Sequence, residues 1–373
     1  LGGRTYPGST RYNDVWSSVD GINWVQETAN AGWPARSAFG LTVHNNKLWI
    51  SGGCNHVDAN LQCDDTLNDV WSSTDGINWA QENPNAAWTE RGGHQMTTYN
   101  DGSGDRLWLL GGRTYPGSTR YNDVWSSTDG INWIQETANA AWSVRDGFIS
   151  LVYDNGSGNK IWIFGGREAS GVLHNDIWSS TDGINWTLEK SDTSLPATGF
   201  QPSKWSHWDP RQGFQLVIFN DGTGDKLWLS GGYNTIQNQN DVWYSGDAIN
   251  WTVINQNYDA EFGSRFDSPI ISYNNKLWLI GGVEKHSGLT NDVWSSTDGI
   301  HWDCEFGPYT LAVEGISCNN PSPSFAARFS HRILVYDDKL WLIGGCDDIS
   351  SGLATCPSGG RLRDVWSFDG TSW

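Results

Sequence analysis

One short motif recurs along the whole chain and constrains its fold more than any other feature. Asp-Val-Trp or Asp-Ile-Trp occurs seven times, and seven or eight residues after its tryptophan comes a second tryptophan, usually preceded by Thr-Asp-Gly-Ile-Asn. These second tryptophans are Trp24, Trp79, Trp133, Trp186, Trp251, Trp302 and Trp373. An Asp-Gly turn between two such segments predicts a β-hairpin. The chain is therefore expected to be an array of similar hairpin-containing units.

A second pattern lies upstream of each complete hairpin. It is an apolar run that ends on a glycine pair, such as Leu48 to Ser51 followed by Gly52-Gly53. A near-continuous apolar run of this length is typical of a strand buried on both faces. One further strand precedes it, joined by Asn45-Asn46 or by a longer glycine-containing turn. Each complete repeat is thus four antiparallel strands, and such repeats of roughly 50 residues are typical of the blades of a β-propeller.

The number of blades follows from counting both patterns. Seven third-and-fourth-strand hairpins are present but only six first-and-second-strand hairpins, because the chain starts at Leu1, before the Gly2-Gly3 pair. We expect one all-β propeller domain over residues 1–373, with seven blades, blade one being incomplete at the N-terminus and completed by upstream residues. The alternative is six closed blades with a partial N-terminal hairpin appended.

The glycine pair followed by paired aromatic residues resembles the kelch repeat of the galactose-oxidase-like propellers, and the resemblance covers essentially the whole chain. The third strand departs from it, with tryptophan where kelch repeats usually have tyrosine. The Ser-Thr-Asp-Gly-Ile-Asn-Trp segment resembles a shortened Asp-box, the hairpin turn of sialidase-like propellers. Both resemblances imply blades arranged around a central channel.

Charge and cysteine content restrict the class of partner and the compartment. The formal charge is -19, which argues against nucleic-acid binding, and no apolar run reaches the roughly 18 residues of a membrane helix. Six cysteines fall into three neighbouring pairs whose spacing does not resemble that of zinc ligands. We expect the disulfides Cys54–Cys63, Cys304–Cys318 and Cys346–Cys356, and hence an extracellular or cell-surface location.

An aromatic residue, two others and an arginine precede the first strand of every complete blade. The pairs are Trp33 and Arg36, Trp88 and Arg91, Trp142 and Arg145, Trp208 and Arg211, Phe262 and Arg265, and Phe325 and Arg328. Since the first strand of a propeller blade lines the channel, a ring of arginines is expected at one channel mouth. Guanidinium forks and aromatic faces suit carboxylates and sugars, so these residues are candidate ligand contacts. The favoured alternative is structural: each arginine pairs with the recurrent aspartate of Asp-Val-Trp.

The two ends of the blades differ in the sequence. Connections from second to third strand, and from fourth strand to the next blade, share one end, and all insertions and all six cysteines fall there. Binding residues concentrate on variable loops of a rigid scaffold, so this end is the better candidate for a site. Trp205, with His207 and Trp208, is an irregular aromatic cluster within one insertion. It is either a ligand site or a loop packed on its own aromatics.

These patterns favour a non-enzymatic extracellular binding or adhesion module that recognises a glycan or a protein through its inserted loops. One alternative is a self-assembling building block of a surface layer or filament, suggested by the near-identical segments 1–24 and 110–133. Another is a glycan-cleaving, sialidase-like enzyme, for which Tyr121 or Glu168 would be the nucleophilic partner. No catalytic residue or cofactor is predicted. No metal ligand is predicted either, because loops such as 101–105 are explained as hairpin turns.

Overall fold

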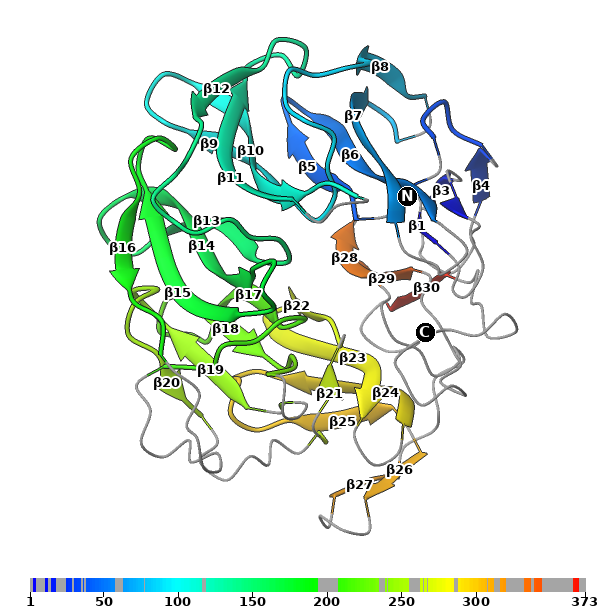
Figure 1. The fold of residues 1–373 in the computed structure, drawn as a ribbon. Helices are drawn as coiled ribbons and strands as arrows, with labels where there is room; N and C mark the ends of the chain where they lie inside the picture. Colours follow the sequence, from blue (N-terminus) through cyan, green and yellow to red (C-terminus); the bar gives the residue numbers. More distant parts are fainter. Residues whose placement is uncertain are drawn as a thin grey trace. The chain divides into compact units, whose positions relative to one another are not determined.

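The computed structural model describes residues 30–306 except 35, 37, 58–62, 77, 116–118, 194–206, 235–238, 240, 255–261, 264, 267 and 285–287, together with short strands on either side. The flanking strands before residue 30 are β1 (Gly3–Arg4), β2 (Arg11–Tyr12), β3 (Val15–Ser17) and β4 (Val25–Thr28). All regular elements of this part of the chain are β-strands (Figure 1). The fold is all-β and propeller-like, as the repeat predicts. No helix in the described ranges is long and apolar enough to cross a membrane.

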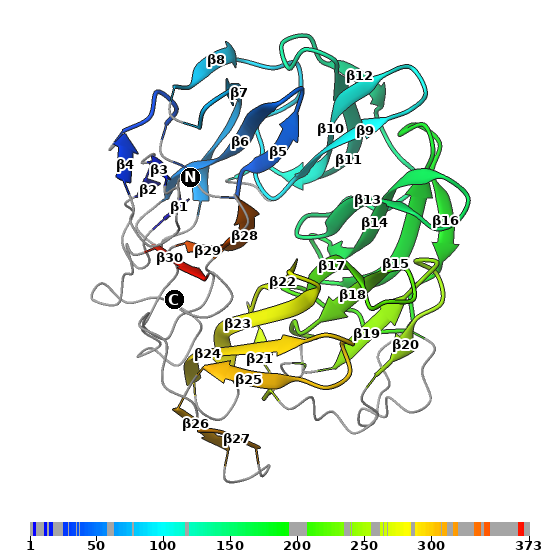
Figure 2. The same ribbon diagram turned by 180° about the vertical axis from the view of Figure 1, so that it is seen from behind.

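The chain forms two compact units, Leu1–Ser17 with Val25–Thr193, and Ser18–Trp24 with Ser194–Trp373. The first unit contains three four-stranded antiparallel sheets whose strands follow one another in chain order (Figure 2). The strands are β5 (Gly40–His44), β6 (Lys47–Val57), β7 (Cys63–Ser73) and β8 (Ala80–Asn83); β9 (Gln95–Asn100), β10 (Asp105–Arg113), β11 (Arg120–Ser127) and β12 (Ile134–Thr137); β13 (Ile149–Asp154), β14 (Asn159–Arg167), β15 (Leu173–Ser180) and β16 (Thr187–Lys190).

The second unit repeats this pattern. Its four-stranded sheet is β17 (Gln215–Asn220), β18 (Asp225–Ser230), β19 (Val242–Ser245) and β20 (Thr252–Val253). The next sheet is β22 (Ile270–Tyr273), β23 (Lys276–Glu284), β24 (Gly288–Ser296) and β25 (Asp303–Phe306), with the short β21 (Arg265–Phe266) also paired to β23. Further strands are β26 (Pro308–Leu311), β27 (Ile316–Asn319), β28 (Arg332–Tyr336), β29 (Lys339–Ile343) and β30 (Val365–Phe368). Five of the expected blades are thus seen with four strands; the total of seven and the single domain stay predictions.

The second strand of each sheet is its buried centre, as its apolar run predicts. In β10, residues 107–110 are all fully buried. They do not form a core within one sheet. Leu107 and Leu109 pack with Trp49 and Val70 of the preceding sheet, whereas Trp108 and Leu110 pack with Trp142 and residues of β14 in the following sheet. These two hydrophobic cores therefore lie between adjacent sheets.

The glycine pair at the end of the second strand is a β-bulge at which adjacent sheets are joined. The β6–β7 register shifts between Ser51 and Gly53, and Gly52 and Gly53 have φ angles of 52° and 101°. Gly53 N donates to Arg91 O at 2.8 Å, and a Cβ on Gly52 would lie 2.8 Å from that carbonyl oxygen. A side chain there would displace the segment that leads into the next sheet, which explains the recurrence of glycine.

Candidate functional site

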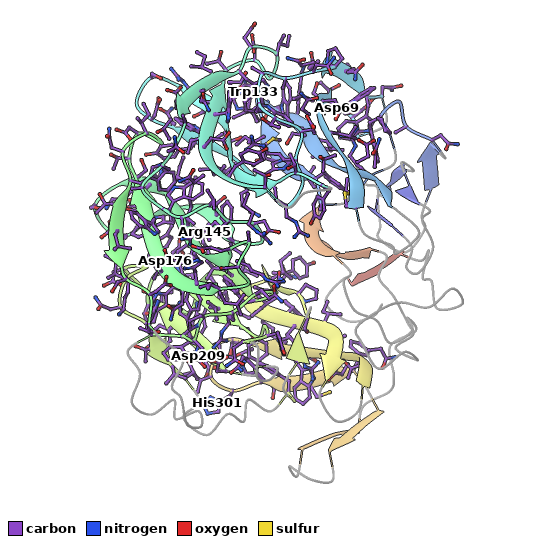
Figure 3. All side chains as sticks on the ribbon, viewed as in Figure 1. Asp69, Trp133, Arg145, Asp176, Asp209 and His301 are labelled. Atoms are coloured by element: carbon purple, nitrogen blue, oxygen red, sulfur yellow. A yellow bond between two sulfur atoms is a disulfide. The ribbon has the colours of Figure 1, made fainter. Side chains whose placement is uncertain are left out.

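The arginines that precede the first strands are buried within their own sheets. Arg91 donates from Nη1 to Asp123 Oδ1 at 2.5 Å, from Nη2 to Asp123 Oδ2 at 2.9 Å, and from Nη1 to Gly111 O at 2.9 Å. Its Nε donates to Thr89 O at 2.9 Å. Fork-to-fork pairs of the same kind join Arg36 to Asp69, Arg145 to Asp176, Arg211 to Asp241 and Arg265 to Asp292. Figure 3 labels Arg145 and Asp176 of one such pair.

Each of these aspartates also binds the tryptophan of its Asp-Val-Trp motif. The indole Nε1 of Trp125 donates to Asp123 Oδ2 at 2.8 Å, and the same contact recurs in the other four sheets. The carboxylate is thereby compensated by a guanidinium and an indole, which a buried charge requires. This arrangement explains why Asp, Trp and Arg recur together. Ligand binding by these arginines stays a prediction, and all five described ones are at most 1% exposed.

The aromatic residues that precede these arginines are also buried. Trp33, Trp88, Trp142 and Trp208 are at most 1% exposed, and each packs edge-on against the second tryptophan of its repeat, with ring centroids 6.1 to 6.4 Å apart. Phe262 and Trp302 repeat the contact at 5.0 Å. Such edge-to-face pairs contribute about 0.5–1.5 kcal/mol beyond the area that they bury.

The irregular aromatic cluster is only partly described. Trp205 lies outside the described residues, as does Arg328. His207 and Trp208 are buried, and their ring centroids lie 4.9 Å apart. Asp209 follows them; its burial raises the pKa of the carboxyl group, and Asn234 Nδ2 donates to it at 3.1 Å.

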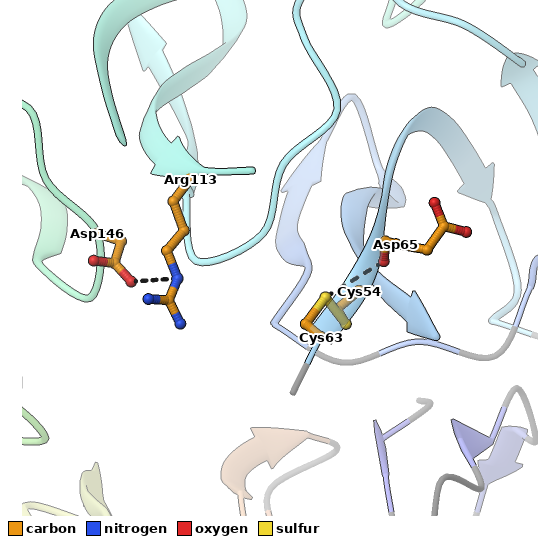
Figure 4. The surroundings of a disulfide bond; sticks show 5 residues. All are labelled: Cys54, Cys63, Asp65, Arg113 and Asp146. Atoms are coloured by element: carbon orange, nitrogen blue, oxygen red, sulfur yellow. Dashed lines mark hydrogen bonds and ion pairs between the residues drawn. A yellow bond between two sulfur atoms is a disulfide. The ribbon is translucent and has the colours of Figure 1, made fainter. Parts of the chain in front are cut away.

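The disulfide Cys54–Cys63 is present as expected and joins the ends of β6 and β7, which are the longest strands described (Figure 4). Cys304 in β25 is also disulfide-bonded. Strand β27, which contains Cys318, lies against β25. The side chains of Cys318, Cys346 and Cys356 lie outside the described residues, so the pairings that involve them stay predictions.

A cluster that the sequence did not single out lies at the end of the sheets where the second and third strands connect, here called the loop end. Asp146, directly after Arg145, faces two arginines of the preceding sheet: Arg120 Nε donates to Oδ1 at 2.5 Å, and Arg113 forms an ion pair in which its Nε lies 3.1 Å from Oδ2. The backbone of Asp146 pairs with Arg167 of its own sheet, by hydrogen bonds of 3.2 and 3.0 Å. Two guanidinium groups thus face one carboxylate, and the charge of a third, that of Arg167, acts on Arg113 from the adjacent sheet. We call these four residues the arginine cluster.

The electrostatics of the arginine cluster differ from those of the buried pairs. Burial lowers the pKa of Arg113, Asp146 opposes this, and the charges of Arg120 and Arg167 lower it further. Arg120 is buried, Arg113 is half-buried and Arg167 is exposed. Arg167 forms no ion pair with any residue of the described ranges. The cluster therefore carries uncompensated positive charge in a chain whose formal charge is -19.

A histidine and two carboxylates lie on the sheet that contributes Asp146 and Arg167. His174 Nδ1 is 2.6 Å from Asp192 Oδ2, and His174 Nε2 is 3.1 Å from Glu168 Oε1. Burial lowers the pKa of His174, but the hydrogen bond to Asp192 and the negative charges of Asp192 and Asp176 together outweigh it, and the net pKa is raised. The imidazolium thereby links the turn after β14 to the segment after β16.

Metal binding and catalysis find little support in this arrangement. Ligand atoms of His174, Asp176 and Asp192 lie within 4.8 Å of one another. Asp176, however, is already bound by Arg145 and Trp178, so it is not free to coordinate a cation. The two residues considered for a nucleophilic pair make different contacts: Tyr121 lies under Arg91, with the guanidinium carbon 4.2 Å from the ring centroid, and Glu168 binds His174.

One sequence signal points to the arginine cluster. Residues 2–16 and 111–125 are identical, Gly-Gly-Arg-Thr-Tyr-Pro-Gly-Ser-Thr-Arg-Tyr-Asn-Asp-Val-Trp. Both copies combine two arginines that other repeats have only singly, as Arg167 after its glycine pair and Arg361 before its Asp-Val-Trp. The backbone register agrees, because Arg4 pairs with Arg11 in β1–β2 as Arg113 pairs with Arg120 in β10–β11. Asp146 itself had no such signal, because the residue after the repeat arginine varies among sheets.

Comparison with known proteins gives limited similarity. No family model matches the chain. An alignment over 226 residues, which covers 58% of this chain, is 28% identical to part of the dynein alpha chain of the flagellar outer arm from Chlamydomonas reinhardtii. The match spans only 5% of that dynein chain.

Proposed function

We propose that this chain is a non-enzymatic, kelch-type binding propeller that acts outside the cell and contacts a glycan or protein partner through its loop end. The observation that carries the proposal is the contrast between the two ends of the sheets. The opposite end, here called the turn end, contains the first-to-second and third-to-fourth strand turns. The polar groups of the turn end are hydrogen-bonded to one another within each turn. The loop end contains the features that differ from sheet to sheet.

The turn end is made of nearly identical, self-satisfied turns. In one of them Asp129 Oδ1 accepts from the backbone of Ile131 and Asn132, and Oδ2 accepts from the Asn132 side chain. Although burial opposes it, these bonds lower the pKa of Asp129 to about 2. The same pattern recurs around Asp182, Asp247 and Asp298. Polar groups already engaged in this way favour an architectural role for the turn end.

The loop end varies and contains charge that is not compensated. It includes the disulfide-linked extension of β6 and β7, the arginine cluster, and the link between His174, Glu168 and Asp192. Variable loops held by a rigid scaffold are the usual position of binding residues. The disulfide is compatible with an oxidising compartment.

The resemblance to a short stretch of a flagellar outer-arm dynein chain supports a second candidate, a building block of a larger assembly. The near-identity of segments 1–24 and 110–133 favours it further, since repeated segments can make repeated contacts. Light scattering of the purified chain distinguishes the two. Concentration-dependent growth in mass supports the building block, whereas a monomer at all concentrations contradicts it.

The binding function is tested with a glycan array and with a pull-down from extracellular material, each using the intact chain. A charge-changing variant at the loop end, Arg167→Gln, is compared with one at the turn end, Asn132→Ala. Retention of a glycan or protein that is weakened only by the loop-end variant supports the proposal. No retention in either assay, or equal weakening by both variants, contradicts it.

A further inference from the structure

We propose that Arg113 and Arg167, at the loop end of adjacent sheets, form a subsite for the carboxylate of an acidic sugar, with the ring of Tyr115 beside it. This inference rests on the proposed binding function and narrows its ligand.

The strand register places two like charges opposite each other. Arg113 and Arg120 are direct partners in the β10–β11 ladder, so their side chains leave the hairpin on the same face. Like charges in directly opposed positions destabilise a hairpin unless an anion lies between them. Asp146 provides one carboxylate for the pair, which leaves the cluster one anion short even before Arg167 is counted.

The guanidinium groups differ in what they still have available for a ligand. Arg120 is 4% exposed and directs Nε at Asp146. Arg113 is 24% exposed; its Nε lies 3.1 Å from Asp146 Oδ2, an ion pair drawn in Figure 4, and its two terminal nitrogens make no hydrogen bond with any described residue. Arg167 is exposed and has no ion pair among the described residues. The Arg120–Asp146 ion pair is therefore the structural part of the cluster. Arg113 and Arg167 supply hydrogen-bond donors for an external anion.

A planar carboxylate is the anion that fits this donor set. Guanidinium groups bind carboxylates through two parallel hydrogen bonds, and such charge-assisted bonds are about twice as strong as neutral ones. A polyanion is disfavoured, because the chain as a whole has a formal charge of -19 and repels it. The ligand is therefore expected to carry a single negatively charged group.

The surroundings of the cluster suit a sugar. The ring of Tyr115 lies under Arg113, with the guanidinium carbon 3.9 Å from its centroid, and offers an apolar edge. On the other side, a tight turn follows Arg167: Glu168 N donates to Val172 O at 2.9 Å, and Gly171 N donates to Glu168 O at 3.0 Å. In this turn Glu168 Oε1 lies 3.1 Å from His174 Nε2, and Glu168 Oε2 accepts from Ser170 Oγ at 3.5 Å. The remaining lone pairs of this half-buried carboxylate can accept from sugar hydroxyl groups.

The subsite is tested by titrating the intact chain with glucuronic acid, with glucose as the neutral match, and following binding by calorimetry and NMR. We expect glucuronic acid to bind and glucose to bind at least tenfold more weakly. Arg167→Gln and Arg113→Gln should each weaken glucuronic acid at least tenfold. Arg106→Gln is the matched control, because Arg106 is a 25% exposed arginine of the same strand β10 that pairs with Glu136 at the turn end. It should change nothing.

Several outcomes would overturn the inference. These are equal binding of glucose and glucuronic acid, no binding of glucuronic acid, or unchanged affinity in Arg167→Gln. Because Arg167 has no ion pair among the described residues, this variant is expected to fold and keeps the test valid if Arg113→Gln does not. Tight binding of a glutamate-rich peptide in place of the sugar acid would also reject the sugar. If the array or pull-down still finds a partner at the loop end, only this inference fails, and the proposed function stands.

Discussion

The indole of Trp49 lies where a side chain on Gly130 would have to be. A Cβ on Gly130 would lie 1.9 Å from Cζ3 of Trp49, a residue of the preceding sheet. The ring is held by Nε1, which donates to His44 O at 3.0 Å. The same relationship joins Trp108 to Gly183 and Trp228 to Gly299. The glycine of the Asp-Gly turn is thus required by the neighbouring sheet as well as by the turn.

Gly130→Ala should therefore destabilise the fold by more than the turn alone accounts for. Overpacking against a fixed ring costs about 1–3 kcal/mol. The matched control is Gly76→Ala, at the same turn position with a φ of 74° against 73°, where the nearest described atom is Leu48 Cδ1 at 3.6 Å. Ala248 occupies this turn position with a φ of 65°, so the backbone accepts alanine. Equal free energies of unfolding for the two variants, measured with denaturant, would contradict the Trp49 contact.

Arg91→Ala should lower the free energy of unfolding far more than the loss of an exposed arginine does. Removing this guanidinium leaves the buried Asp123 carboxylate with only the Trp125 indole, and breaking a buried pair costs about 3–5 kcal/mol. The same change at Arg106, which is 25% exposed and pairs with Glu136 at 3.2 Å, should cost about 0–1 kcal/mol. Thermal and denaturant unfolding of both variants measures the difference. Comparable small losses at both positions would show that Arg91 is not structural.

The fold can be predicted from the sequence because its motifs repeat. Asp-Val-Trp, the glycine pair and the Asp-Gly turn recur in each sheet, and each has one local role, so strand order and buried strands follow from spacing. The sequence leaves open whether Arg91 points into a channel or into its own sheet, because both directions give the same spacing. In the structure the fork of the Arg91 guanidinium binds Asp123.

The loop end is harder to predict for a physical reason. Asp146 binds Arg113 and Arg120 across a sheet boundary, through a position that is Ser37, Gly92 and Gln212 in other repeats. A contact that occurs in one sheet leaves no periodic signal. The same holds for the link between His174 and Asp192.

Removing the disulfide by Cys54→Ser with Cys63→Ser should loosen one hairpin while leaving its sheet intact. The bond closes a loop with a sequence separation of 9, and loss of such a constraint costs about 3 kcal/mol in the chain-entropy model. Hydrogen exchange should accelerate in residues 54–57 and 63–66 and stay slow in residues 47–51, which lie in the buried part of β6. The β10–β11 hairpin, which has arginines at its end, is the internal control. Uniform acceleration over both hairpins would contradict a local effect.

The link between His174 and its two carboxylates should make the turn of residues 168–172 sensitive to pH. Asp192, Glu168 and Asp176 face His174 with negative charge, and Arg145 with positive charge. The pKa of His174 in the folded chain is raised above its ordinary value of 6.5, so its stabilisation is complete below that value and is lost as the pH rises through the raised pKa. The pKa of Asp192 is lowered despite burial, so its contribution is lost only in strong acid. The protection factors of the amides of residues 168–174, in which the intrinsic pH dependence of exchange is divided out, should therefore be highest between about pH 5 and 6.5 and lower above neutrality. His174→Gln should remove this dependence, whereas His301→Asn, which restores the asparagine of the other turns, should leave it unchanged. A pH profile that persists in His174→Gln would assign the effect to another group.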